Sequence, residues 1–235
     1  MEFTTVEANG VALSVRLFRP NAGVEAKSLT LILVHQYSVL GGCQGLLKGM
    51  ANMLAAKGFT TITFDMRGAG RSSGRPSITG SAEVQDVIAV CKWAVDKLPA
   101  PSILLIGSSA GAPIAGSAID QVKEVVGYVS LGYPFGILAS VLFGRHNKAC
   151  LQSEKPKLFV MGTSDGFTSV KQLENKLKTA AGRIETKLVP GVGHFQLEGP
   201  DYDNLMIDYV TEFADSIVQS QPEASSSSDL YSSAD

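Results

Sequence analysis

A serine inside a glycine-rich turn is the first residue whose setting indicates chemistry. Ser109 is the central residue of the pentapeptide GSSAG at 107–111, which directly follows the apolar run 103–106 and directly precedes alanine-rich residues. A strand, a sharp turn and a helix in this order form a nucleophile elbow, which exposes a serine hydroxyl above the carboxyl end of the strand. The helix also directs the positive end of its dipole toward a developing oxyanion. The pattern therefore predicts a nucleophilic Ser109, and a simple glycine turn is the alternative.

A serine nucleophile needs a base, and the chain has three histidines. His146 lies in the polar segment 144–148, which we expect to be a solvated loop. His35 ends an apolar run, and we expect it to brace a loop through hydrogen bonds. His194 lies between the last expected strand and the last expected helix, in a loop that can hold an imidazole over the carboxyl edge of a sheet. We therefore predict that His194 is the base, and an ordinary loop histidine is the alternative.

The base needs a carboxylate that orients its ring. The acidic residues between Ser109 and His194 are Asp120, Glu124, Glu154, Asp165, Glu174 and Glu185. Of these, Asp165 alone comes immediately after an expected strand, so it shares an edge of the sheet with the other two groups. We predict that Asp165 orients the base. The alternative is that Asp165 caps the helix that follows it.

The elements that must position these groups alternate between strands and helices. Runs rich in β-formers predict strands at 3–7, 11–18, 29–34, 59–64, 102–106, 125–131, 157–161 and 183–189. An Asn-Gly turn signal joins the first two as a hairpin, and the other six lack alternation, as expected for strands covered on both faces. Helical spacing occurs at 46–54, 84–95 and 205–217. The sequence predicts an α/β fold, with a mostly parallel eight-stranded sheet, an N-terminal antiparallel hairpin and helices on both faces.

Composition limits the classes of function. The 20 Lys and Arg residues against 22 Asp and Glu residues leave a net charge of −2, so we expect no nucleic-acid partner. No apolar run approaches the ~18 residues of a membrane span, so we expect no membrane insertion. Three cysteines without a C-x-x-C pair favour reduced core residues, and the amino terminus lacks a signal-peptide pattern. We therefore expect a cytoplasmic protein without bound metal.

The chain is expected to form a single domain over residues 1–219. Residues 220–235 lack an apolar period and contain a serine run, so we predict a disordered tail there.

Taken together, these motifs resemble the α/β-hydrolase superfamily over nearly all of residues 3–219. The order Ser109, Asp165, His194 is typical of that superfamily. Three further stretches resemble its oxyanion-hole strand and loop, its fourth-strand loop and its histidine loop: LILVHQYSVLGG at 31–42, FDMRGAGRSSG at 64–74 and GVGHF at 191–195. The likeness is closest to small dienelactone-hydrolase and acyl-peptidase-like serine hydrolases.

The resemblance implies a serine hydrolase that cleaves a small or acyl carboxylic ester through an acyl-enzyme, with thioester or amide cleavage as variants. Ser109 would attack the carbonyl, His194 would take its proton, and Asp165 would hold the imidazole. No metal or organic cofactor is implied, and a small-molecule ester is the expected partner of a monomer or homodimer. Two alternatives remain: a small-molecule receptor with slow turnover that uses the same triad, and a lyase.

The resemblance also assigns an oxyanion hole to the backbone amides of Tyr37 and Ala110. Gln36 stands where the family usually has glycine or proline, which affects the path of that loop. The phenol of Tyr37 is a further candidate donor, and simple packing of its ring over the loop is the alternative. Asp65 and Arg67, in the fourth-strand loop, are expected to tie loops together.

The expected cap is minimal, because the window 133–155 is too short for a lid of several helices. Its apolar half, 134–143, predicts one short helix over the site, or else residues that only close the core. The predicted substrate contacts are Gln36, Ser108, Phe135 and Leu138.

Overall fold

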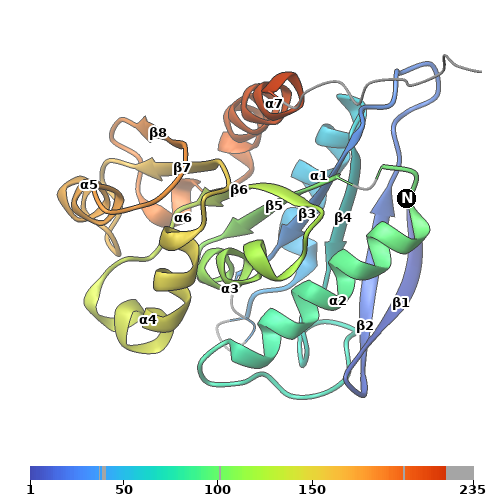
Figure 1. The fold of residues 1–235 in the computed structure, drawn as a ribbon, viewed down its shortest axis with the longest axis horizontal. Coiled ribbons are helices and arrows are strands. Elements are labelled where there is room, and N and C mark those ends of the chain that lie inside the picture. Colours follow the sequence, from blue (N-terminus) through green and yellow to red (C-terminus); the bar gives the residue numbers. More distant parts are fainter. Residues whose placement is uncertain (37, 39–40, 101, 198, 221–235) are drawn as a thin grey trace, which may run out of the picture.

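The predicted sheet is present in full in the computed structural model, which describes residues 1–36, 38, 41–100, 102–197 and 199–220, with the backbone alone for 137–140. Its eight strands are β1 (Glu2–Ala8), β2 (Val11–Phe18), β3 (Leu29–Val34), β4 (Thr60–Phe64), β5 (Ser102–Ser108), β6 (Val125–Leu131), β7 (Lys157–Gly162) and β8 (Ile184–Val189). They lie in the order β1-β2-β4-β3-β5-β6-β7-β8 (Figure 1). The expected strands are therefore confirmed, within a residue or two at their ends.

The sheet is antiparallel only at its amino-terminal end. β1 pairs with β2 and β2 pairs with β4 in antiparallel registers, whereas β4, β3, β5, β6, β7 and β8 are all parallel. The hairpin turn uses Asn9 and Gly10, both with positive φ (51° and 78°), as the Asn-Gly signal predicts. Because the parallel strands run the same way, their carboxyl ends meet at one edge of the sheet.

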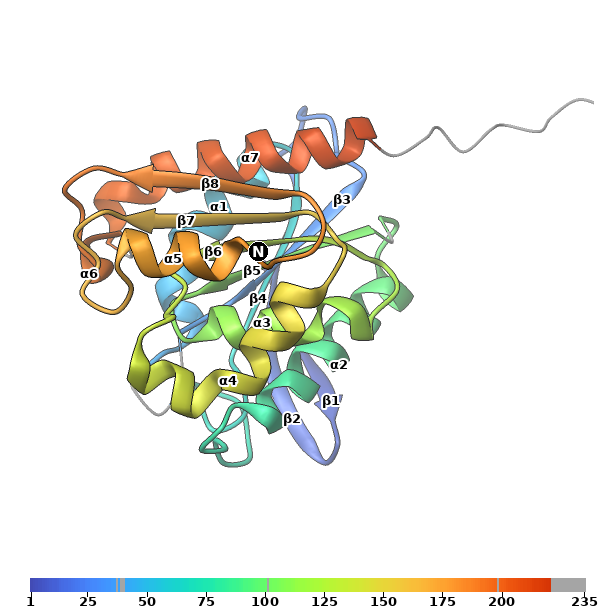
Figure 2. The same ribbon diagram turned by 60° about the vertical axis from the view of Figure 1, so that its left-hand side comes forward.

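Helices cover both faces of the sheet. They are α1 (Lys48–Ala56), α2 (Ser81–Lys97), α3 (Gly111–Ala118), α4 (Ile137–Gln152), α5 (Val170–Leu177), α6 (His194–Leu197) and α7 (Asp203–Ser220), with short 3-10 turns at Gln44–Leu47, Ile119–Gln121 and Pro200–Tyr202. Figure 2 shows α7 on one side of the sheet and α2, α3 and α4 on the other. Two apolar cores result, one with side chains from α2 and α3 and the other with side chains from α1 and α7.

The central strands are buried on both faces, but β8 is an exception to the prediction. β3 and β4 are buried along their whole length and β5 along all but its first residue, whereas most side chains of β8 remain partly exposed. β8 is the last strand in the sheet, so it has a neighbouring strand on one side only. Its position at the edge explains the difference.

The helix α4 corrects the prediction for His146. The segment 144–148 is helical rather than a solvated loop, and His146 is buried. Its Nε2 donates to the carbonyl oxygen of Thr79 (2.7 Å), and its Nδ1 accepts from the hydroxyl of Ser117 on α3 (2.6 Å). The polar residues around His146 suggested solvent, but the helical turn leaves Arg145 and Lys148 exposed and buries the imidazole together with Asn147.

Other expectations concern the termini and the cysteines. α7 ends at Ser220, so the predicted tail begins one residue too early, and its remainder lies outside the described residues.

Cys91 and Cys150 are buried, which raises the pKa of each thiol to about 12, and Cys43 is partly exposed. Within the described part of the chain, no helix is both long and apolar enough to cross a membrane.

Candidate active site

The turn between β5 and α3 has the backbone of a nucleophile elbow. Ser109 has φ of +49°, a left-handed conformation that is strained for a residue with a side chain. Its N–H donates to the carbonyl oxygen of Leu131 (2.8 Å), which ties the turn to the end of β6. The hydroxyl of this partly exposed serine is therefore held at the carboxyl edge of the sheet.

The two glycines of the pentapeptide are required by close packing. A Cβ at Gly107 would lie 2.5 Å from Cα of Ala112, and one at Gly111 would lie 2.0 Å from the carbonyl oxygen of His35. No side chain fits at such distances, so the glycines allow the helix to start directly against β5 and the end of β3. The spacing G-x-S-x-G thus follows from this contact.

A continuous hydrogen-bond chain links three side chains from separate loops. Ser109 Oγ lies 2.7 Å from His194 Nε2, and His194 Nδ1 lies 2.6 Å from Asp165 Oδ2. An ionised carboxylate only accepts, so Nδ1 carries the proton and Nε2 accepts from the serine hydroxyl. The imidazole is therefore in the tautomer that can take a proton from Ser109. The structure brings together the three residues singled out in the sequence.

Asp165 is held as an anion. Its Oδ1 accepts from the backbone amides of Phe167 (2.7 Å) and Thr168 (2.9 Å). Burial opposes ionisation, but the hydrogen bond from His194 and these two amides outweigh it, so the pKa of the Asp165 carboxyl lies below its ordinary value. The buried anion can thus stabilise positive charge on His194.

The alternative of a helix cap for Asp165 is wrong. The cap of α5 is Ser169, whose hydroxyl accepts from the backbone amide of Gln172, while the Gln172 side chain accepts from the amide of Ser169. This reciprocal pair is a capping box. Asp165 instead belongs to the turn that precedes the helix, with one carboxylate oxygen left for His194.

A glycine packs directly against the imidazole of His194. Gly132 follows β6 with φ of +69°, and a Cβ there would lie 3.2 Å from His194 Cε1. Its N–H donates to the carbonyl oxygen of Val160 (2.8 Å). The absence of a side chain at Gly132 therefore leaves room for the ring, a role that sequence reasoning missed.

The predicted oxyanion hole lies partly outside the described residues. Ala110 occupies the N-cap position of α3 and is buried beside Ser109. Tyr37 is not among the described residues, and Gln36, one residue earlier, is partly exposed with a buried Oε1. The two-amide oxyanion hole therefore stays a prediction.

The other predicted substrate contacts differ in their setting. Ser108 is buried at the end of β5. Phe135 is buried and stacks on Tyr133, with ring centroids 4.1 Å apart, and its N–H donates to Thr168 Oγ1 (2.7 Å). Phe135 thus packs in the core below the site, and the side chain of Leu138 lies outside the described part. Beyond Gly136, α4 packs along α3 (Figure 2).

Sequence reasoning also missed two exposed phenylalanines beside the imidazole. The ring centroid of Phe167 lies 4.6 Å from that of His194, and the centroid of Phe195 lies 5.5 Å from it. Phe195 directly follows His194 in the sequence, and Phe167 lies two residues after Asp165. A search for apolar residues next to the proposed triad positions could have found both.

His35, Arg67 and Asp65 connect neighbouring segments through hydrogen bonds and an ion pair. His35 Nε2 accepts from the backbone amide of Met66 (3.0 Å), its Nδ1 contacts the carbonyl oxygen of Gln36, and burial lowers its pKa. Arg67 Nη2 pairs with the buried Asp86 (2.6 Å). Asp65 accepts from the backbone and side chain of Gln44 (both 2.9 Å). These contacts match the expected tying of loops.

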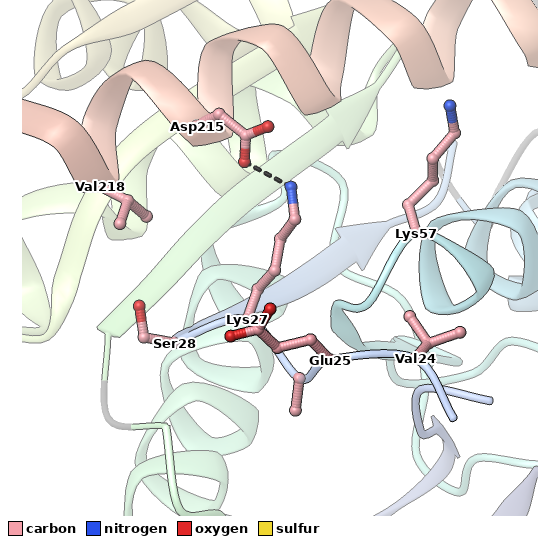
Figure 3. A pocket seen from close by; sticks show the side chains of 8 residues that line it. Val24, Glu25, Lys27, Ser28, Lys57, Asp215 and Val218 are labelled. Atoms are coloured by element: carbon pink, nitrogen blue, oxygen red, sulfur yellow. Dashed lines mark hydrogen bonds and ion pairs between the residues drawn. The ribbon is translucent and has the colours of Figure 1, made fainter. Parts of the chain in front are cut away.

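A cavity of about 590 Å³ lies elsewhere on the molecule (Figure 3). It is lined by residues just before β3, by Lys57 before β4 and by the end of α7, so it lies at the amino edge of the parallel strands. Lys27 reaches across it to Asp215 (2.5 Å). Its described lining residues include none of the three groups that form the hydrogen-bond chain.

The fold and this chain of side chains define a class of protein. Residues 31–135 match the family model for the alpha/beta hydrolase fold. An alpha-beta serine hydrolase homologue from Coxiella burnetii is similar with a TM-score of 0.75 and 26% identity, covering 90% of this chain and 96% of that chain. A serine hydrolase without lid from Xanthomonas campestris has a TM-score of 0.78 at 21% identity, covering 94% and 96%. The chain has the α/β-hydrolase fold that its motifs indicate.

One curated relative matches over part of its length. An uncharacterized 31.7 kDa protein from Escherichia coli, in the traX-finO intergenic region, is 33% identical over 126 residues. The match covers 52% of this chain and 42% of that protein, so this chain matches less than half of the relative's length.

Proposed function

We propose that this protein is a serine hydrolase that cleaves carboxylic esters through an acyl-enzyme. The observation that carries the proposal is the chain from Ser109 Oγ to His194 Nε2 (2.7 Å) and from His194 Nδ1 to Asp165 Oδ2 (2.6 Å). The α/β-hydrolase fold and the likeness to structures of serine hydrolases support hydrolase activity. Beyond hydrolase activity, we propose that the substrate is an ester and that Ser109, His194 and Asp165 are the catalytic triad.

In acylation, Ser109 Oγ attacks the carbonyl carbon while His194 Nε2 takes the hydroxyl proton. The carbonyl oxygen becomes an oxyanion, and the backbone amide of Ala110 at the start of α3 is a candidate donor to it, together with Tyr37. The tetrahedral intermediate then collapses. The bond between the carbonyl carbon and the alcohol oxygen breaks, and His194 gives the proton to that oxygen.

In deacylation, water takes the place of the alcohol. His194 removes a proton from the water as it attacks the acyl carbon, and the same proton returns to Ser109 Oγ when the ester to the enzyme breaks. The Asp165 anion stabilises the imidazolium in both halves. We propose an unobstructed site for a small-molecule ester, because the similar Xanthomonas campestris enzyme is described as having no lid and α4 packs along α3.

The test is intact-mass analysis after treatment with a fluorophosphonate. We expect one adduct on the wild type and on Ser108→Ala, and none on Ser109→Ala. The neighbouring serine is a suitable control because it is buried at the end of the same strand, and the hydroxyl that contacts His194 is that of Ser109. No adduct on the wild type would refute an activated Ser109 and would favour the small-molecule receptor over the esterase.

A further inference from the structure

Exposed apolar side chains gather on the segments that follow the parallel strands. Leu46 follows β3, Ile78 follows β4, Val141 follows β6, Phe167 follows β7 and Phe195 follows β8, and all five are exposed. The carboxyl ends of these strands form the edge that holds Ser109 and His194. Exposed apolar side chains beside reacting groups indicate a surface that contacts an apolar ligand.

Two of these side chains touch the imidazole itself. The rings of Phe167 and Phe195 lie edge to face at 5.6 Å between centroids, and each also packs against the ring of His194. Phe167 is 45% exposed and Phe195 is 73% exposed, so both present much of their surface to solvent beside the reacting groups. We refer to Phe167 and Phe195 as the aromatic pair.

The backbone holds both members of the aromatic pair in place. The amide of Phe167 donates to Asp165, and its carbonyl oxygen lies so near Gly136 that a Cβ there would be 2.3 Å away. Phe195 lies on α6, which turns His194 and Leu197 inward and Phe195 outward. A surface formed before the ligand arrives loses little freedom on binding.

The aromatic pair lies where the alcohol half of an ester must be during acylation. His194 Nε2 must come within hydrogen-bond distance of the departing alcohol oxygen in order to protonate it. The substituent on that oxygen therefore lies beside the imidazole, where the aromatic pair is. The acyl substituent is attached instead to the carbonyl carbon that Ser109 Oγ attacks.

We propose that the aromatic pair binds the alcohol part of the substrate, and that the preferred esters carry an aromatic or bulky apolar alcohol. This inference rests on the proposed esterase function and adds its substrate class. Edge-to-face contacts with an aryl ring would be made in acylation and lost once the alcohol leaves.

The experiment compares three esters: benzyl acetate, 2-methoxyethyl acetate and methyl phenylacetate. The first two share an acyl group and differ in the alcohol, while the third carries the aryl group on the acyl side. We expect the wild type to favour benzyl acetate over 2-methoxyethyl acetate in kcat/KM. Phe195→Ala and Phe167→Leu should each reduce that preference about threefold to tenfold, and each should lower kcat/KM for benzyl acetate by a larger factor than kcat/KM for methyl phenylacetate.

Two controls separate this inference from the proposed function. Phe3→Ala removes another exposed phenylalanine, on β1, and should change none of the three values. Fluorophosphonate labelling should persist in all variants, because its leaving group is fluoride and has no substituent for the aromatic pair to bind.

The outcomes are distinct. A wild type that labels but does not favour benzyl acetate, or variants that keep the wild-type preference, would overturn this inference alone. Equal losses on benzyl acetate and methyl phenylacetate would also overturn it, because the effect would then not depend on which half of the ester carries the aryl group. A wild type that neither labels nor hydrolyses any of the esters would overturn the proposed function and this inference with it.

Discussion

Residues without reactive groups control the alignment of the three that we propose to be reactive. Gly107 and Gly111 allow α3 to begin directly against the sheet, which places Ser109 at φ of +49°. Gly132 plays a comparable part for His194, because its missing side chain leaves the space into which the ring fits. Reaction rates depend steeply on such alignment, since a displacement of ~1 Å can cost about a hundredfold.

The substitution Gly132→Ala tests this alignment. The new Cβ would lie 3.2 Å from His194 Cε1, so the imidazole must move. We expect kcat/KM for an ester to fall about tenfold or more. The matched control is Gly23→Ala, which has a similar φ (+83° against +69°) and no atom within 4 Å of the new Cβ. Equal activity in the two variants would refute a positioning role for Gly132.

At the scale of elements, one buried histidine on α4 makes hydrogen bonds to two other segments. His146 connects α4 to Ser117 on α3 and to Thr79 in the loop before α2. Burial is the main cause that lowers the pKa of His146 below its ordinary 6.5. The folded state therefore disfavours the protonated imidazole more than the unfolded chain does.

The sign of the pH dependence follows from this shift. Above pH 6.5 the imidazole is neutral in both states, so its contribution to stability is complete. As the pH falls below 6.5 toward the lowered pKa, the unfolded chain binds the proton first, and the free energy of unfolding decreases.

We expect the urea midpoint of the wild type to be lower at about pH 5.5 than at about pH 7.5, and His146→Leu to weaken that dependence. The free energy of unfolding of the same variant should be lower by about 1–3 kcal/mol at the higher pH, because Ser117 Oγ and the Thr79 carbonyl lose their hydrogen-bond partner. The control is Lys148→Ala, at an exposed position on the same helix, and its urea midpoint should change with pH as that of the wild type does. If His146→Leu leaves the pH dependence of the urea midpoint unchanged, that dependence belongs to another group, such as His35.

At the scale of the whole molecule, the sheet is most buried at its centre and least at its two ends. β5 lies between β3 and β6 and is almost wholly buried, whereas β1 and β8 are the outer strands and are partly exposed. Local opening requires least free energy where buried contacts are few.

Hydrogen exchange followed by mass spectrometry should therefore show a gradient. We expect the amides of β5 to exchange most slowly, and those of β1 and β8 to exchange well before them. Protection of β8 equal to that of β5 would contradict this expectation for a monomer. It would indicate that a second copy covers the outer strand, as in the homodimer that the sequence left open.

Much of the fold and the candidate site was open to prediction because it rests on local patterns. The strand of Ile103–Ile106, the small residues around Ser109 and the Asn9-Gly10 turn act over a few residues, and these patterns predicted the elements correctly. The order of Ser109, Asp165 and His194 along parallel strands was enough to place all three at one edge of the sheet.

Tertiary contacts decided what local patterns could not. The burial of His146 and the exposure of β8 each depend on which distant segment lies alongside. Phe167 and Gly132 belong to the same group, since their contacts with His194 join residues far apart in the chain. By itself, the sequence determined the elements and the shared edge, because these follow from backbone propensity and strand direction. Only the tertiary structure decided the neighbours of each side chain, because burial and packing depend on the whole chain.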